Sequence, residues 1–285
     1  MPLRFVRWFA VLAAALLLPV APLRAQKSPP LPDLLKLASD YVTQYARQLG
    51  AVSADEEFTQ YETSSGRMGT PKRVNSQIVL VGQDDGAIGS FRDVVAIDSV
   101  PVRPKDDRLP KLFAPPTPAA VSSAQEMTDA AVKAYLSQNL HIFDKPLMAL
   151  DLLRADNQSN YAYKIEGNKT LNGIPVVAVR FNEKGKGHLM KDASAVGRYW
   201  IDSATGEVHQ TELGFSAQNA NIHSTVKFTK DAQLGVLVPS ELAETVELSS
   251  TAAGMSDMGS GGAPSSQHEA LEGRATYTKY RRAGA

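Results

Sequence analysis

The spacing of apolar residues divides the chain into helical and strand-forming stretches. From Leu34 to Leu49, apolar side chains recur every three or four residues, which places them on one face of a helix. Asp33 before this stretch and Gly50 after it are suitable cap residues, so we predict a helix over residues 33–50. Alternating runs follow and predict strands at residues 57–63, 74–81 and 87–98, with turn residues at 82–86.

Two more helical segments occupy the middle of the chain, and strands fill the rest. Ser122 or Ser123 is placed to cap a helix that reaches about residue 140, and a shorter helical run follows at residues 146–153. In residues 221–230, Ile222, Val226 and Phe228 share one face, as in a half-buried antiparallel strand. Further strands are predicted at residues 161–165, 174–181, 236–248 and 274–280, with turn residues at 167–173.

This order of elements predicts the fold class. Strands and helices do not alternate, so a parallel doubly wound sheet is disfavoured, and we predict an α+β fold with a single antiparallel sheet and helices packed on one face. We expect one domain over residues 26–285. It includes a Pro-rich segment at 101–119 and a Gly/Ser-rich stretch at 249–267, interpreted as a mobile loop.

Residues 197–213 form the clearest hairpin pattern. Asp202 is placed to accept hydrogen bonds from the backbone of the turn, and Gly206 tolerates the positive φ that closes it. On the first strand, Tyr199 and Ile201 point to one face, while Arg198 and Trp200 point to the other. Bulky residues on both faces are typical of a strand inside a sheet whose two faces are each partly covered.

The same hairpin carries a family resemblance. Trp200-Ile201-Asp202 with Thr205-Gly206, together with residues 226–241 and 272–280, resembles periplasmic lipoprotein carriers and outer-membrane lipoprotein-sorting proteins. The resemblance implies a strongly curved, incomplete antiparallel barrel with helices closing its concave side, and an apolar interior that accepts acyl chains. The candidate residues lining such a cavity are Val177, Val179, Phe181, Tyr199, Ile201, Val226 and Phe228.

The N-terminus predicts export. Arg4 and Arg7 precede an uncharged apolar run at residues 9–20, and Ala25 offers a small residue for cleavage, so residues 1–25 have the layout of a signal peptide. We expect a periplasmic or secreted protein without a transmembrane segment in the mature chain. Cys is absent, which excludes disulfides, a thiolate nucleophile and a lipid anchor on Cys.

Charge and motifs give no sign of catalysis. The chain has 30 basic and 30 acidic residues, so nucleic acid is not an expected partner. The five His residues have no metal-ligand spacing, although His209 and His223 are candidates for neighbours on paired strands. The charged residues between Arg103 and Arg108 are interpreted as a surface ion network. We therefore predict no enzyme activity, no cofactor and no metal site.

Two functions follow from these patterns. The first is a non-enzymatic binding protein for an apolar ligand, either a lipid or a lipidated partner. The second is a protein-interaction or peptidase-regulatory module of the cell envelope, because residues 202–208 also resemble the hairpin of propeptide domains that inhibit secreted peptidases. A cavity of several hundred Å³ would favour the first, and a filled core with an exposed apolar edge would favour the second. The oligomeric state stays open.

Overall fold

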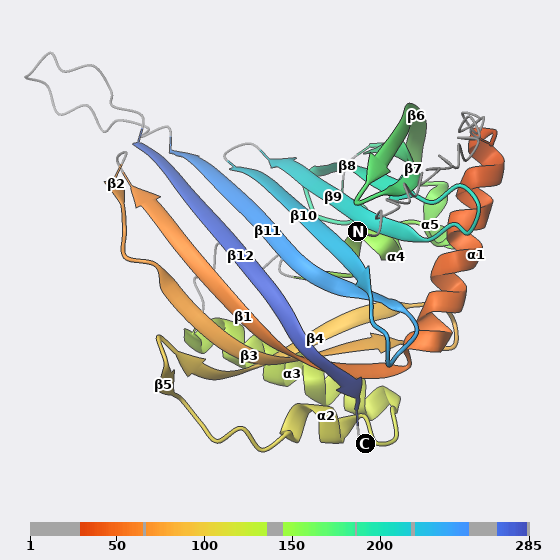
Figure 1. Cartoon of the computed structure of the whole chain (residues 1–285). Coiled ribbons are helices and arrows are strands. Elements are labelled where there is room, and N and C mark those ends of the chain that lie inside the picture. Colours follow the sequence, from red (N-terminus) through yellow and green to blue (C-terminus); the bar gives the residue numbers. More distant parts are fainter. Residues whose placement is uncertain are drawn as a thin grey trace, which may run out of the picture.

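A computed structural model describes residues 29–64, 67–135, 145–185, 187–217, 220–250 and 267–283. The predicted signal peptide, the end of the second predicted helix and most of the predicted loop 249–267 lie outside these residues. The described part contains a large, curved antiparallel sheet with helices at its sides (Figure 1). The predicted α+β class, with one antiparallel sheet that does not close into a barrel, is confirmed.

The sheet has twelve strands, ordered β5-β4-β3-β1-β12-β11-β10-β9-β8-β7-β6, with β2 beside β1. Hairpins join neighbours along the C-terminal half, while β12 returns to pair with β1 from Val52 to Ser64. The strands are β1 Ala51–Ser64, β2 Arg67–Met68, β3 Lys72–Gly82, β4 Ile88–Ile97, β5 Val100–Pro101, β6 Tyr161–Leu171, β7 Ile174–Glu183, β8 Ser194–Ile201, β9 Val208–Ala217, β10 Ala220–Lys230, β11 Leu237–Ser250 and β12 Gln267–Arg282.

The first predicted helix begins earlier than its pattern suggests. Helix α1 spans Leu31–Leu49, with Pro30 at the N-cap, so the prediction of Asp33 as the cap is wrong. Pro32 lies in the first turn, where its missing N–H costs no hydrogen bond. Asp33 instead places its charge in that turn, near the positive end of the helix dipole. The other helices are α2 Arg108–Leu112, α3 Pro118–Tyr135, α4 Met148–Asp151 and α5 Ala155–Gln158.

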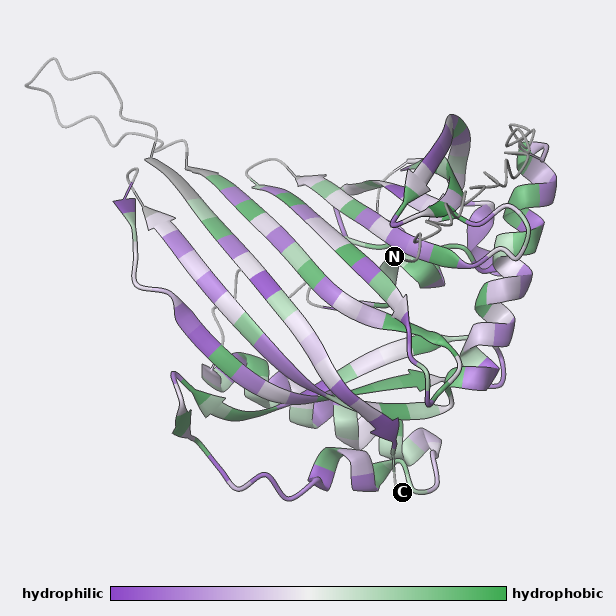
Figure 2. Cartoon of the chain, in the orientation of Figure 1, coloured by the Kyte–Doolittle hydropathy of each residue, from purple (hydrophilic) through white to green (hydrophobic). Residues whose placement is uncertain are grey.

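The main core lies on one face of the sheet, here called the inner face. Hydropathy alternates along β10, β11 and β12, as Figure 2 shows, and their large apolar residues, such as Val226, Leu242 and Leu271, belong to this core. Helix α1 packs here through Leu34, Val42, Tyr45 and Leu49, each at most 1% exposed. Two glycines let it approach closely, because a Cβ on Gly82 would lie 2.0 Å from the Ala46 carbonyl oxygen and one on Gly206 2.5 Å from that of Leu37.

A second, smaller core lies on the opposite, outer face of β3 and β4. Val79 and Val81 belong to it, whereas their neighbours Ile78 and Leu80 belong to the main core, so successive residues of β3 serve different layers. Helices α2 and α3 cover this face through Leu109, Phe113, Ala120 and Ala124. The Pro-rich segment therefore contains a helix and contributes to a core.

Both hairpin predictions in the C-terminal half can be compared with the structure. In the β8–β9 turn, Asp202 Oδ1 accepts hydrogen bonds from the N–H groups of Ala204 and Thr205 at 2.7 and 3.2 Å, as predicted. The predicted turn at residues 167–173 is too long, because β6 continues to Leu171. The turn needs only Asn172 and Gly173, whose φ values of 50° and 83° are typical of a two-residue hairpin.

Candidate functional site

The predicted wall residues on β7 and β8 lie in a packed part of the inner core. Phe181 stacks on Tyr199 with ring centroids 4.8 Å apart, and Tyr161 meets Phe181 edge-on at 5.6 Å. The Tyr199 hydroxyl donates to the Ala149 carbonyl at 2.9 Å, which ties the stack to α4. Gly197 makes room for this arrangement, since a Cβ there would lie 2.5 Å from the Phe181 ring.

The remaining wall residues share this face. Val177, Val179, Ile201 and Val226 are at most 4% exposed and belong to the same core. Phe228, on β10, lines a pocket of about 330 Å³ at the ends of strands β9, β10 and β11. The predicted residues are therefore brought together on one face, as the alternation requires. Their role as the lining of a ligand cavity stays a prediction.

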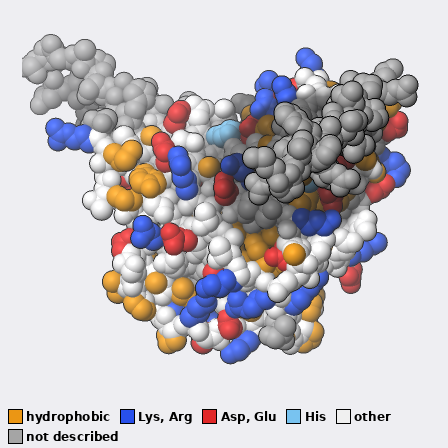
Figure 3. Space-filling view, in the orientation of Figure 1, with side chains coloured by type: hydrophobic (Ala, Val, Ile, Leu, Met, Phe, Trp, Pro, Cys, Tyr) orange, Lys and Arg blue, Asp and Glu red, His pale blue; other side chains and the backbone are white. Residues whose placement is uncertain are grey.

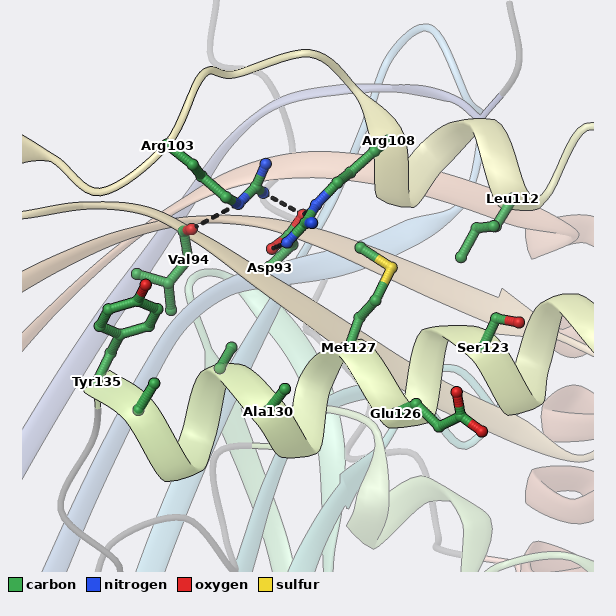
Figure 4. Close-up of a pocket in the computed structure, with 12 residues that line it drawn as sticks. Asp93, Val94, Arg103, Arg108, Leu112, Ser123, Glu126, Met127, Ala130 and Tyr135 are labelled. Carbon is green, nitrogen blue, oxygen red and sulfur yellow. Dashed lines mark hydrogen bonds and ion pairs between the residues drawn. The ribbon is translucent and has the colours of Figure 1, made fainter.

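A larger opening, here called the edge groove, lies where α3 passes the free edge of β4. Its volume is about 500 Å³ (Figure 4). Helix α3 supplies one wall, with Met127 and Ala130 facing β4, and α2 adds Leu112. Val94 and Ala131, which also belong to the inner core, form part of the lining. The groove thus lies between the second core, on the outer face, and the edge of the main core, on the inner face.

The wall of the edge groove opposite α3 is strongly polar (Figure 4). Asp93 is only 1% exposed, and both Arg103 and Arg108 point at its carboxylate (Figure 4). Arg108 binds it in a bidentate manner at 2.7 and 2.8 Å. Arg103 forms a second ion pair with Asp93 and donates to the Val94 carbonyl at 2.9 Å. Because burying an unpaired carboxylate is costly, the two guanidinium groups are needed to hold Asp93 in place.

The groove exists because α3 contacts β4 through small side chains. Ala120, Ala124, Thr128 and Ala131 are its buried residues. Thr128 takes the place of a neighbouring strand: its Oγ1 accepts a hydrogen bond from the Arg92 N–H at 2.9 Å and lies 2.8 Å from the Ala124 carbonyl oxygen. The helix therefore satisfies the edge of the sheet without filling the space beside it.

Away from the second core on β3 and β4, the outer face carries polar side chains, as β8 shows. On β8, the Arg198 guanidinium lies 5.5 Å above the Trp200 ring and binds Glu166 and Glu212, so both sides of this strand are covered, as predicted. Acidic and basic side chains are interspersed on the face seen in Figure 3. Within the described residues, no three His, Asp or Glu side chains gather as a metal site would require. Among the helices that the structure describes, none has the length and apolar character of a membrane crossing.

The two His residues that the sequence suggested as neighbours are far apart in register. His223 pairs with Gly214 and is exposed, so that hypothesis is wrong. His209 lies near the other end of β9 and is only 7% exposed. The burial of His209 could have been predicted from the sequence, because His209 continues the series of inward residues Thr211, Leu213 and Phe215 at a period of two.

No family model and no curated protein matches this chain. Its fold is similar to several solved structures. A DUF1329 family protein from Desulfovibrio piger is 13% identical, over 90% of this chain and 95% of that one, with a TM-score of 0.40. A domain named for outer-membrane lipoprotein sorting, from Vibrio parahaemolyticus, is 11% identical, over 88% and 93%, with a TM-score of 0.36. A LolA superfamily protein from Nitrosomonas europaea is 10% identical, over 85% and 92%, with a TM-score of 0.32.

The names of the second and third structures match the broad group that the hairpin resembles. The identities and TM-scores are low, so the similarity carries no inference about ligand or partner. A proposal for the function therefore rests on the pockets and side-chain contacts of this chain.

Proposed function

We propose that this protein binds an apolar ligand, such as the acyl chain of a lipid or of a lipidated partner, and that the ligand lies in the edge groove. The observation that supports this most is the volume of about 500 Å³ beside α3. Pockets of this size, with mostly apolar walls and a few polar groups, are typical of small-molecule sites.

The walls of the groove suit a hydrocarbon chain. Leu112, Met127, Ala130 and Ala134 line it, and Met is well suited to irregular apolar ligands because its side chain is flexible. Each methylene that leaves water contributes about 0.8 kcal/mol, so a chain of ordinary length is sufficient for micromolar binding after the costs of association. The Arg103–Asp93–Arg108 cluster adds charged groups on the wall opposite α3, where they can contact a polar group of the ligand.

The proposal places the ligand differently from the sequence prediction. The predicted wall residues on β7 and β8 are packed against one another and α4, whereas the groove touches the inner core at its edge, through Val94, Ala131 and Tyr135. Export to the periplasm or outside the cell, a single domain and the absence of catalysis remain part of the proposal. They rest on the signal-peptide pattern and on the lack of a catalytic motif.

The test is a titration with a fluorescent fatty acid, combined with native mass spectrometry for co-purified lipid. Ala130→Phe places a ring in the groove from an exposed helix position, and Ala119→Phe makes the same change on α3 outside it. We expect Ala130→Phe to weaken binding at least about tenfold and Ala119→Phe to leave it unchanged. Saturable binding that both variants retain would reject the groove, and no binding at all would reject the function.

A further inference from the structure

The pocket beside Phe228, here called the His209 pocket, is separate from the edge groove. It lies where the β6–β7 turn meets the ends of β9, β10 and β11, and it has a volume of about 330 Å³. The apolar walls consist of Leu171, Ile174, Phe228 and Leu237. The polar part consists of His209, on β9, and Glu207, the residue just before β9. None of these residues lines the edge groove.

His209 is buried without a hydrogen bond at one ring nitrogen. The side chain is only 9% exposed, and its Nε2 has no partner among the described residues. The nearest carboxylate oxygen, Oε2 of Glu207, is 3.9 Å away, which is too long for a hydrogen bond. Buried polar atoms normally have partners, so an unsatisfied nitrogen at a pocket wall indicates a place for a ligand atom.

The distance between His209 Nε2 and Glu207 Oε2 indicates which kind of ligand atom fits between them. One donor nitrogen can sit about 2.9 Å from both His209 Nε2 and Glu207 Oε2, because the two acceptors are 3.9 Å apart. To bind both, the ligand must donate two hydrogen bonds from one atom. A hydroxyl has a single donor hydrogen, whereas an ammonium has three. The pair therefore favours an ammonium over an alcohol.

The charges around the pocket agree with this choice. Glu207 and Asp202 are acidic, and Lys230 lies 3.7 Å from Glu207 but is 62% exposed, so an entering cation can displace it. Burial lowers the pKa of His209, and Lys230 lowers it further, while Glu207 and Asp202 act in the opposite direction. The imidazole is therefore neutral at pH 7, and with the proton on Nδ1 its Nε2 accepts a hydrogen bond.

We propose that the His209 pocket binds a primary ammonium group carried on an apolar body, with the nitrogen between His209 Nε2 and Glu207 Oε2 and the body against Phe228 and Leu237. This site is independent of the proposed lipid groove.

The experiment is a calorimetric titration of the full chain at pH 7 with three probes that share the same phenylethyl body. 2-Phenylethylamine has the ammonium, 2-phenylethanol has one donor and no charge, and trimethyl(2-phenylethyl)ammonium has the charge without a donor. We expect the amine to bind at least about tenfold more tightly than the other two, because charge-assisted hydrogen bonds need both features. Equal binding of all three probes, or no binding of the amine, overturns the proposal.

Variants show whether this pair is the site. Glu207→Gln and His209→Phe each remove one hydrogen-bond acceptor, and each should weaken binding of 2-phenylethylamine about tenfold. Glu241→Gln is the matched control, because Glu241 is also paired with a strand lysine, Lys227, at 2.8 Å but lies outside the pocket. Since Glu207 is 27% exposed, Glu207→Gln is expected to fold even if His209→Phe does not. Unchanged amine affinity in Glu207→Gln overturns the proposal, whereas Ala130→Phe should not affect this titration.

Discussion

Helices α1 and α3 both pack against the β3–β4 region, but they leave different amounts of space. Helix α1 lies on the inner face and buries Leu34, Val42, Tyr45 and Leu49, and two glycines bring its backbone close to the sheet and the β8–β9 turn. Helix α3 lies at the edge and on the outer face, and it buries mainly alanines. A groove of about 500 Å³ remains beside α3. The size of the buried residues thus distinguishes a helix that packs closely on a core from one that leaves a groove beside it.

The largest effect should come from the aromatic stack, which belongs to the sealed region. Phe181 is fully buried and contacts both Tyr161 and Tyr199, so Phe181→Ala should destabilise the protein by about 3–5 kcal/mol. A denaturant melt measures this difference. A loss below about 1 kcal/mol would mean that this part of the inner core is hollow, as a cavity at the predicted wall residues requires.

A matched pair of substitutions tests the two helices directly. Leu34→Ala on α1 should cost about 2–5 kcal/mol, because Leu34 is 0% exposed and a cavity would remain. Met127→Ala on α3 should cost less than about 1 kcal/mol, because Met127 faces the groove and is only partly buried. Similar losses in the two melts would contradict the contrast between the helices.

Besides its packing, α3 is attached to the sheet edge through the Thr128 hydroxyl. Thr128→Val keeps the shape but removes the hydroxyl oxygen that accepts a hydrogen bond from the Arg92 N–H, which should cost about 1–3 kcal/mol. Thr128→Ser retains the hydroxyl and serves as the control. If Thr128→Val and Thr128→Ser have the same stability, α3 is held by packing alone and the hydrogen bond to the edge contributes nothing.

The sequence predicts the fold better than the site. Strand alternation places Tyr199, Ile201, Val226 and Phe228 on one buried face, as found, because period two depends only on the backbone. It does not tell a filled core from a cavity, since both use the same residue types. The pairing of β1 with β12 also joins residues more than 200 positions apart, which no local pattern indicates.

The sequence does not predict the edge groove, for a similar reason. Asp93 gives no signal within its strand, and its partners Arg103 and Arg108 appear as part of an ordinary charged surface run. Only the fold of the Pro-rich segment over β4 brings these side chains together. The small residues of α3 are a visible feature of the sequence, but their meaning depends on which face of β4 the helix covers.

The most direct test locates the ligand by nuclear magnetic resonance. A fatty acid with a spin label on its chain is added to isotope-labelled protein, and the broadening of each amide signal is measured. We predict that broadening concentrates at residues 123–135 of α3, at 103–112 and around Val94. Broadening centred instead on residues 177–181 and 199–201, with α3 unaffected, would place the ligand inside the sheet and contradict the edge groove as the binding site.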